Sequence, residues 1–302
     1  KIWSANNFLR LNDCKLNQKI NIKSLNLSVN QWIFNEYINT QNLVTKNIEI
    51  FRFDEAAKHA YKFVWHSYCD WYLEFLKPII NSKNKKNINE VKNFSSFMMS
   101  NILRLLHPFI PFFTESIWSK NKYNKFFKSD LINSLWPNYK KIAKFNKNQQ
   151  DINNLIELVS NIRSTKAELK ITPKLYCDLS FSENKGKLEE LIMSNLNLIK
   201  QIGRINGITQ KKSDNKNAVD ILVLKEKISL GFNEDINLHS QKERILQKLS
   251  SIKNQINILN NKLKNKAYLT NAPKEIVQND KKLVKELTIE DEKLRSIVSS
   301  IN

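Results

Sequence analysis

The chain has little glycine, proline, cysteine and histidine, and these shortages exclude several classes of protein. Of its 302 residues only four are glycine and six are proline, which argues against a loop-rich β sandwich and favours long helices. The cysteines, Cys14, Cys69 and Cys177, are too few and too widely spaced for a disulfide framework or a zinc site, and they suit a reducing compartment. No apolar run reaches the roughly 18–20 residues that a membrane span requires, so we expect no membrane association.

The start of the chain shows no targeting signal. Residues 1–12 have no initial methionine and no signal-peptide pattern, and their apolar spacing is that of a helix already under way. We therefore expect the chain to be part of a longer, cytoplasmic protein.

The charge of the chain is strongly one-sided. Its 49 lysines and arginines against 29 aspartates and glutamates give a formal net charge of +20 at pH 7. Such a surplus favours a polyanionic partner, because each phosphate contacted by lysine or arginine releases condensed counterions. The alternative is that the charge only maintains solubility or reflects biased codon usage, since lysine and asparagine are abundant throughout.

Helical periodicity dominates the first 145 residues. Apolar residues recur every three or four positions in five segments, residues 1–17, 28–49, 54–77, 90–106 and 114–119. The two prolines of the segment HPFIP (107–111) must break the helix between the last two, because proline has no backbone donor. Residues 131–139 have a partly extended pattern. We predict a bundle of four or five helices over residues 1–145.

Residues 51–78, FRFDEAAKHAYKFVWHSYCDWYLEFLKP, are the most informative segment. Their apolar residues form one helical stripe, with Asp54 placed to cap its start and Pro78 placed to stop it. Taken as physics alone, the pattern predicts a buried helix of an all-α bundle.

The pattern changes after Pro173 from helical to alternating. A helix is predicted over residues 151–170, and the alternation of Leu175, Cys177, Leu179 and Phe181 with polar residues then indicates a half-buried strand. A further helix and two short strands are predicted at residues 187–202, 218–224 and 228–232. We predict a small α/β module over residues 146–235.

Residues 236–302 have a heptad pattern. Ile245, Ile252 and Leu259 lie seven apart, and the pattern resumes after an interruption at residues 267–272, where Pro273 can open a second helix. Two helices joined by so short a link must fold back on each other. The pattern predicts an antiparallel two-helix coiled-coil hairpin, and a buried pair of globular helices is the alternative.

The two arms of the predicted hairpin differ in charge. Residues 241–266 carry seven basic residues against Glu243 alone, net +6, whereas residues 273–302 carry six basic and six acidic residues. A purely structural pair would tend to balance its arms. The basic first arm therefore indicates a surface that lies on phosphates.

No motif for catalysis or metal binding stands out. His66 and Cys69 lie three apart on a predicted helix without a third group to orient them, and a structural role fits both better. Gly203 and Gly207 lie in the segment IGRING, which we interpret as a helix end and turn, not as a phosphate-binding loop. We predict no catalytic residue and no metal site in this chain.

Several stretches resemble the valyl-tRNA synthetase family. Residues 51–78 contain its Arg-Phe-x-x-Ala-Ala and Cys-Asp-Trp-Tyr-Leu-Glu elements, and residues 103–118, LRLLHPFIPFFTESIW, resemble its Leu-His-Pro-Phe-x-Pro-Phe-x-Thr-Glu-x-x-Trp signature. Residues 162–173, IRSTKAELKITP, resemble its Ile-Arg-x-x-[Arg/Lys]-Ala-Glu-x-x-Ile-x-Pro element, and residues 1–8, KIWSANNF, resemble Lys-Leu-Trp-Asn-Ala-x-Arg-Phe. The hairpin, with Asn-Ala-Pro at 271–273, resembles the valyl-specific tail, which leucyl and isoleucyl enzymes lack.

The resemblance implies a mainly α protein in three parts. The bundle would be an anticodon-binding domain, the α/β module a linker, and the hairpin an arm against the outer corner of the tRNA. The partner would be tRNA(Val), bound by a monomer. The His-Ile-Gly-His and Lys-Met-Ser-Lys-Ser loops of such enzymes are absent, so we expect tRNA binding without catalysis. ATP and Mg²⁺ would serve only the full-length enzyme, and this chain would hold no cofactor.

The resemblance also suggests site residues. Anticodon contacts are expected from the first helix and from the 162–173 element, at Lys1, Asn7, Phe8, Arg10, Arg163 and Lys166. Contacts with the tRNA body are expected from the first arm of the hairpin, at Lys242, Arg244, Lys248, Lys253, Lys262 and Lys264. Asn7 stands where the family usually has arginine, and a position in the core is the alternative for Phe8. A free-standing tRNA-binding protein or RNA chaperone, and a coiled-coil adaptor for proteins, remain as alternatives.

Overall fold

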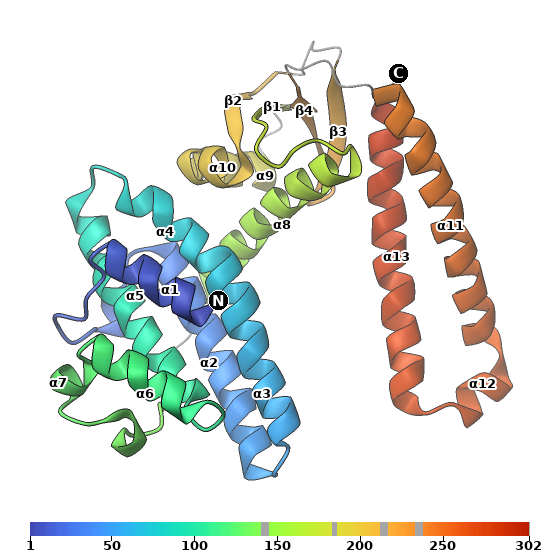
Figure 1. Cartoon of the computed structure of the whole chain (residues 1–302). Coiled ribbons are helices and arrows are strands. Elements are labelled where there is room, and N and C mark those ends of the chain that lie inside the picture. Colours follow the sequence, from blue (N-terminus) through green and yellow to red (C-terminus); the bar gives the residue numbers. More distant parts are fainter. Residues whose placement is uncertain (140–144, 183–185, 212–216, 233–237, 302) are drawn as a thin grey trace. The chain divides into compact units, whose positions relative to one another are not determined.

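The computed structural model describes residues 1–139, 145–182, 186–211, 217–232 and 238–301 (Figure 1). The chain divides into two compact units, Lys1–Asn153 and Asn154–Asn302. The division falls within the helix α8 (Asn146–Glu168). Each unit is described by itself.

The first unit is a helical bundle, as predicted. Its elements are α1 (Ile2–Leu11), the 3₁₀ turn η1 (Ile22–Ser24), α2 (Ser28–Glu49), α3 (Phe53–Lys62), the π-helix η2 (Phe63–Tyr72), α4 (Leu73–Ile80), α5 (Lys85–Leu106), α6 (Pro111–Lys120), α7 (Tyr123–Phe127) and the 3₁₀ turn η3 (Leu131–Asn133). Large side chains fill its core, where Trp118, Tyr37 and Phe34 are at most 2% exposed. The buried hydroxyl of Tyr72 donates to Asn30 at 2.8 Å.

The predicted helix over residues 54–77 is longer and less regular than expected. It runs through α3, η2 and α4, and its middle ten residues form a π-helix. The prediction that Pro78 stops the helix was wrong, because Pro78 lies inside α4 and the helix continues to Ile80. A proline near a helix end removes only one donor, and here the helix ends two residues later.

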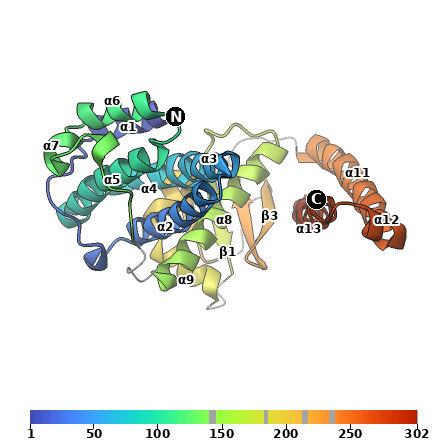
Figure 2. The ribbon, with the colours of Figure 1, turned by 90° about the horizontal axis from the view of Figure 1, so that it is seen from below.

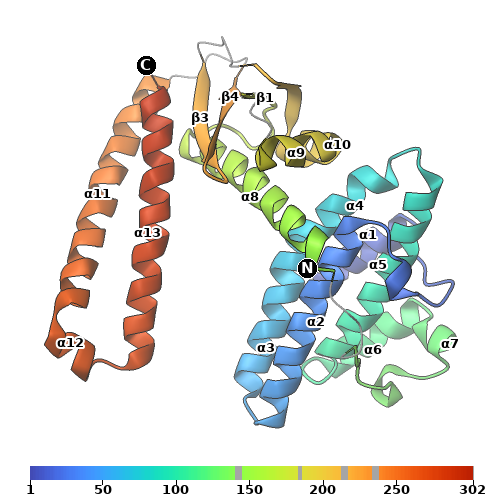
Figure 3. The ribbon, with the colours of Figure 1, turned by 180° about the vertical axis from the view of Figure 1, so that it is seen from behind.

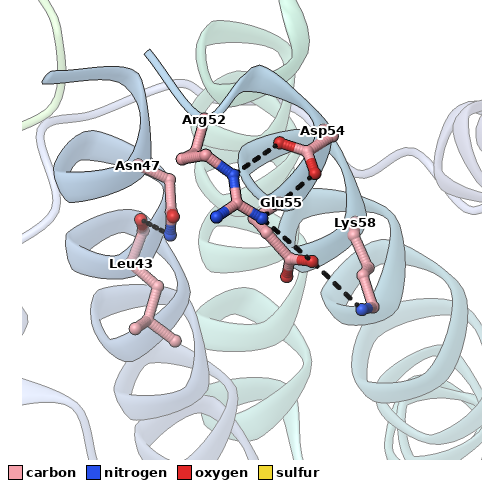
Figure 4. Close-up of polar contacts among 6 residues, drawn as sticks. All are labelled: Leu43, Asn47, Arg52, Asp54, Glu55 and Lys58. Atoms are coloured by element: carbon pink, nitrogen blue, oxygen red, sulfur yellow. Dashed lines mark hydrogen bonds and ion pairs between the residues drawn. The ribbon is translucent and has the colours of Figure 1, made fainter. Parts of the chain in front are cut away.

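The start of α3 also differs from the prediction. Arg52 is the N-terminal cap residue, and its side chain makes no capping hydrogen bond. Asp54 lies in the first turn, where Arg52 donates to its carboxylate at 3.2 Å (Figure 4). This hydrogen bond and one from the backbone of Glu55 lower the pKa of Asp54. Glu55 also lies 3.3 Å from Lys58, so the ion pairs of this segment are local to the first turns of α3.

The helix is interrupted at Pro108 and Pro111, as the sequence predicts. The helix α5 ends at Leu106, and Pro111 occupies the first turn of α6, where its missing N–H costs nothing. His107 lies at this break, and its Nδ1 is 2.9 Å from the hydroxyl of Thr114, which donates to the carbonyl of Pro111 at 2.9 Å.

The second unit begins with a small mixed sheet. After α8 come β1 (Cys177–Phe181), α9 (Lys187–Ser194), α10 (Leu196–Gly203), β2 (Ile205–Thr209), β3 (Ala218–Val223) and β4 (Glu226–Gly231). The strand order is β2-β1-β4-β3, with β1 parallel to β2 and the other pairs antiparallel. The helices α9 and α10 form the crossover between the parallel strands (Figure 3).

Two local predictions in this unit were wrong. The helix predicted over residues 187–202 is interrupted at Asn195. The segment IGRING was expected to be a helix end and turn: α10 does end at Gly203, but β2 begins at Ile205, where the turn was expected. Gly207 donates its N–H to Asp178 at 2.9 Å, and an added Cβ would lie 3.0 Å from that carboxylate oxygen.

The hairpin is confirmed, with α11 (Leu238–Lys264), the short α12 (Lys266–Asn271) and α13 (Lys274–Ser300). Figure 1 shows α11 and α13 side by side with α12 at the end opposite the C-terminus, and Figure 2 shows the hairpin from below. Apolar burial is strong at the base, where Ile245, Leu294 and Ile297 are at most 3% exposed. It weakens toward the end that carries α12, where Ile276 is 47% exposed.

Candidate nucleic-acid interface

Two cation–aromatic pairs lie at α1, Lys120 with Trp3 and Lys1 with Trp65, and we call them together the α1 face. Trp3 is 44% exposed, and the ammonium of Lys120, at the end of α6, lies 4.5 Å from the centre of its ring. Lys1 lies 4.0 Å from the ring of Trp65. Trp65 in turn stacks on exposed Tyr61 at 5.1 Å between ring centres. Such cation–aromatic pairs can hold RNA bases by stacking while the cations contact phosphate.

Lys1 is also paired with a carboxylate. Its ammonium lies 2.7 Å from Asp70, which His66 approaches at 3.4 Å. Both partners of the Lys1–Asp70 pair are exposed enough for solvent to screen it, so a phosphate can compete for the lysine. Nearby, burial raises the pKa of Cys69 to about 11, with Lys1 opposing the shift, which leaves Cys69 a protonated, unreactive thiol.

The other α1 candidates divide between two positions. Asn7 and Arg10 line a cavity beside the end of α1, together with Lys120 and Lys122. Phe8 is half-buried, so it belongs in part to the core. The predicted residues Lys1, Asn7 and Arg10 therefore share one helix, and the structure adds Trp3 and Lys120, which sequence periodicity gave no reason to choose.

The candidates from the 162–173 element lie in the second unit and serve the fold. Lys166 is 3% exposed, and its ammonium donates to the carbonyls of Leu175, at 2.8 Å, and Gly203, at 3.3 Å. Arg163 donates to the carbonyl of Ile202 at 3.1 Å. Both cations thus satisfy carbonyls at the end of α10 and before β1, and we leave Lys166 out of the interface.

Three of the predicted hairpin residues form contacts at its base, where α11 begins and α13 ends. Lys242 donates to the carbonyl of Ile301, and Arg244 donates to the carbonyl of Glu168. Lys248 pairs with the carboxylates of Glu168 and Glu290, the second at 2.9 Å. Burial acts to lower the pKa of Lys248, but these two carboxylates outweigh it and raise the pKa. These cations join α8 and both arms.

The other hairpin candidates lie toward the end that carries α12, where the charge concentrates. Between residues 253 and 285 eight lysines face only Glu275 and Asp280, net +6. The lysines are Lys253, Lys262, Lys264, Lys266, Lys274, Lys281, Lys282 and Lys285, and all are exposed. We call residues 253–285 the distal hairpin. Both arms contribute lysines to the distal hairpin. In the folded hairpin the positive charge therefore separates the end that carries α12 from the opposite end, in addition to separating the two arms.

One distal lysine is held in place. Lys262 lies 2.9 Å from Asp280 and 4.6 Å from the ring of Tyr268, whose hydroxyl donates to Asp280 at 2.7 Å. The hydrogen bond with Asp280, then that with Tyr268, raises the pKa of Lys262. Hydrogen bonds from Lys262 and then from Tyr268 lower the pKa of Asp280.

The described residues offer no sign of a metal centre or a membrane segment. Among them, no group of three or more histidine, cysteine, aspartate or glutamate side chains could hold a metal ion. No helix within the described ranges is long and apolar enough to cross a membrane.

Two family models match the chain. One, for the anticodon-binding domain of tRNA ligases, matches residues 30–181, and the other, for the valyl tRNA synthetase tRNA binding arm, matches residues 237–302. A valine–tRNA ligase of Pelagibacter ubique is 37% identical over 281 residues, which are 93% of this chain and 32% of that protein. The chain belongs to the valyl-tRNA synthetase family.

Other members of the valyl-tRNA synthetase family match it at similar length. The valine–tRNA ligases of Mesorhizobium japonicum and Bartonella quintana are each 31% identical over 297 residues, or 97% of this chain. The chain spans about a third of the length of these relatives, 32% in each case. Within the family it corresponds to the anticodon-binding domain and the tRNA-binding arm. The helix α1 precedes the first matched residue.

Proposed function

We propose that this chain binds tRNA(Val) as the tRNA-gripping portion of a valine–tRNA ligase. The observation that carries the proposal is the pairing of lysines with the exposed ring of Trp3 and the half-buried ring of Trp65 at α1, in a chain that matches the models of an anticodon-binding domain and a tRNA-binding arm. The basic distal hairpin supplies a second, separate surface. The chain itself would neither activate valine nor transfer it.

The α1 face would hold the anticodon. Unpaired bases can be splayed and stacked on aromatic or guanidinium planes while lysines contact the backbone. Trp3, with Lys120 4.5 Å from its ring, and Trp65, with Lys1 4.0 Å from its ring, are suited to this. Phe8 and Arg10 remain candidates from the sequence, the first as a partly exposed ring, whereas Arg163 lies in the second unit and stays a separate prediction of the sequence.

The distal hairpin would lie on the tRNA body. Its contacts would come from Lys253, Lys262 and Lys264, and the lysines at its base would keep the arm in place. Such contacts carry no sequence information and supply affinity that depends on salt. Selectivity for tRNA(Val) would then come from the bundle and general affinity from the hairpin.

The rest of the reaction would belong to the full-length enzyme. ATP and Mg²⁺ would serve its catalytic portion, and we propose that the whole acts as a monomer in the cytoplasm. None of the proposed contacts in this chain requires a metal ion or a nucleotide cofactor.

Comparison of two transcripts tests the proposal. The chain is titrated with tRNA(Val) and with the same transcript changed at the middle and third anticodon bases, A and C. Loss of good base contacts should weaken binding by about 1–3 kcal/mol per base. ATP–pyrophosphate exchange with valine should stay at background. Equal affinity for both transcripts would show that the chain does not read the anticodon. ATP–pyrophosphate exchange above background would contradict the proposal that the chain binds tRNA without activating valine.

A further inference from the structure

One surface of the helical bundle is apolar. A cavity of about 400 Å³ lies between the C-terminal end of α2, the first residue of α3 and the break between α5 and α6. Large apolar side chains close to its lining residues in the chain are exposed, Phe51 by 79%, Phe112 by 92% and Leu135 by 89%. Monomeric proteins rarely leave a contiguous apolar surface uncovered. We call this surface the apolar patch, and its residues are Ile48, Ile50, Phe51, Phe53, Phe109, Phe112, Leu135 and Trp136.

The polar groups at the cavity are already bonded to one another. Trp136 donates its Nε1–H to the hydroxyl of Thr45 at 2.9 Å, and the same hydroxyl accepts from the amide of Gln41 at 3.0 Å. The remaining lining is apolar except for Glu49. The cavity therefore suits an apolar side chain better than the polar edge of a base.

Phe51 has a strained backbone that the bundle itself does not explain. Its φ is 59°, in the left-handed region where a bulky residue is an outlier. Its N–H bonds the carbonyl of Ile48 at 3.0 Å, and the N–H of Arg52 bonds that of Asn47 at 2.8 Å, the pattern in which a helix end usually has glycine. The ring of Phe51 lies 6.3 Å from that of Phe53 but stays largely exposed. Strain in a residue that contributes so little to the core points to a contact with something else.

The charge around the apolar patch differs from that of the whole chain. The segments that form it carry three basic and five acidic residues, whereas the chain as a whole carries +20; the segments are residues 46–58, 107–115 and 130–136. Two of the three cations, Arg52 and Lys58, are paired with carboxylates in the first turns of α3 (Figure 4). A surface of negative charge does not attract phosphates, and exposed aromatic residues are typical of protein interfaces. The apolar patch therefore fits a protein partner better than tRNA.

We propose that the apolar patch packs against the remaining portion of a full-length valine–tRNA ligase, with Phe51 as its anchor. About two thirds of each relative lies outside the match with this chain, so a protein surface is available within the same polypeptide in this family. An aromatic anchor beside an apolar cavity is the usual centre of such a contact. The contact would hold the bundle in a fixed position relative to the catalytic portion. This inference goes beyond tRNA binding and does not depend on it.

Side-chain labelling tests the packing directly. Hydroxyl radicals are applied to this chain and to the full-length ligase that contains it, both without tRNA, and oxidation is measured by mass spectrometry. Phe51 and Phe112 should be labelled at least about fivefold more slowly in the full-length ligase, because the contact excludes water. The control is Tyr61, a ring 55% exposed that stacks on Trp65 of the α1 face, and it should be labelled equally in both. Equal labelling of Phe51 and Phe112 in the two proteins would overturn the inference.

The same labelling distinguishes other partners. If a second copy of the chain covers the apolar patch, protection of Phe51 in this chain rises with its concentration, and sedimentation shows a dimer. If tRNA covers it, protection appears only when tRNA(Val) is added. Either result would overturn the inference. Failure of the chain to bind tRNA(Val) would overturn the proposed function alone, since the labelling is done without RNA.

The variant Phe51→Gly separates the anchor from the fold. Glycine adopts the left-handed backbone without strain, so the variant chain should melt at the same temperature or higher and bind tRNA(Val) as before. In the full-length ligase the same change should lower kcat/KM for aminoacylation about tenfold and leave ATP–pyrophosphate exchange unchanged, because the catalytic portion is intact but the bundle is displaced. The control Leu224→Gly replaces an apolar residue at φ 52° in the second unit and should not affect aminoacylation. Unchanged aminoacylation by Phe51→Gly would contradict the anchor role.

Discussion

Replacing three lysines of the distal hairpin should weaken tRNA binding in a salt-dependent way. The variant is Lys253→Gln, Lys262→Gln and Lys264→Gln, all exposed and on α11. Helix propensity changes little, because lysine and glutamine are similar helix formers. The apolar contacts that hold the arms together lie at the base, so the fold should persist.

The expected magnitude follows from the pairing of these lysines. Lys262 is already paired with Asp280 at 2.9 Å, so it is part of a nearly neutral group. Lys253 and Lys264 should therefore carry most of the effect. At about 0.9 per neutralised phosphate, two contacts make the log–log salt slope shallower by about 1.8. The ratio of the tRNA affinity of the unaltered chain to that of the variant should then fall about tenfold between 50 and 200 mM salt.

Filter binding of tRNA(Val) from 50 to 400 mM potassium chloride gives both slopes. A matched control replaces Lys83, Lys85 and Lys86, which are equally exposed but lie around the start of α5 in the first unit. The control should keep the original slope. If the distal variant also keeps it, the distal hairpin does not lie on phosphates, and its charge has another purpose.

Three further outcomes concern stability. Lys166→Met should lower the free energy of unfolding by about 3 kcal/mol in a denaturant titration, because the carbonyls of Leu175 and Gly203 lose a buried donor. Lys248→Met should cost only about 1 kcal/mol by the same measurement, since its ion pairs are partly exposed. The lowered pKa of Asp280 stabilises the distal hairpin above its unfolded pKa, about 3.9, and this contribution is lost as pH falls through the folded pKa. The protection factors of the α12 amides, measured by hydrogen exchange and corrected for the intrinsic rate at each pH, should fall at that pH, and unchanged protection would contradict the role of Asp280.

The long periodic elements were predictable from the sequence because their signal is local and repeated. The helix α2 spans the predicted residues 28–49, and the heptads gave both arms of the hairpin. The π-helix η2 and the strand β2 were missed. A π-helix shares the apolar residues of an α-helix, and the glycine of β2 is placed by Asp178, far away in the sequence.

The roles of individual lysines could not be predicted from the sequence. Lys166 and Lys264 are the same residue type on predicted helices, yet one is buried against carbonyls and the other is exposed. Lys248 meets Glu168, 80 residues earlier, only once α8 and α11 have packed together. Lys120 and Lys122 reach α1 in the same way, through the folded bundle. Tertiary contacts therefore decide which cations are available to RNA.

Hydroxyl-radical footprinting of tRNA(Val) by this chain tests the central claim most directly. The account predicts two separate protected regions, the anticodon loop under the α1 face and the outer corner of the tRNA under the distal hairpin. The Lys253, Lys262 and Lys264 variant should lose the second region and keep the first. Protection confined to one region, or spread evenly along the tRNA, would contradict the account.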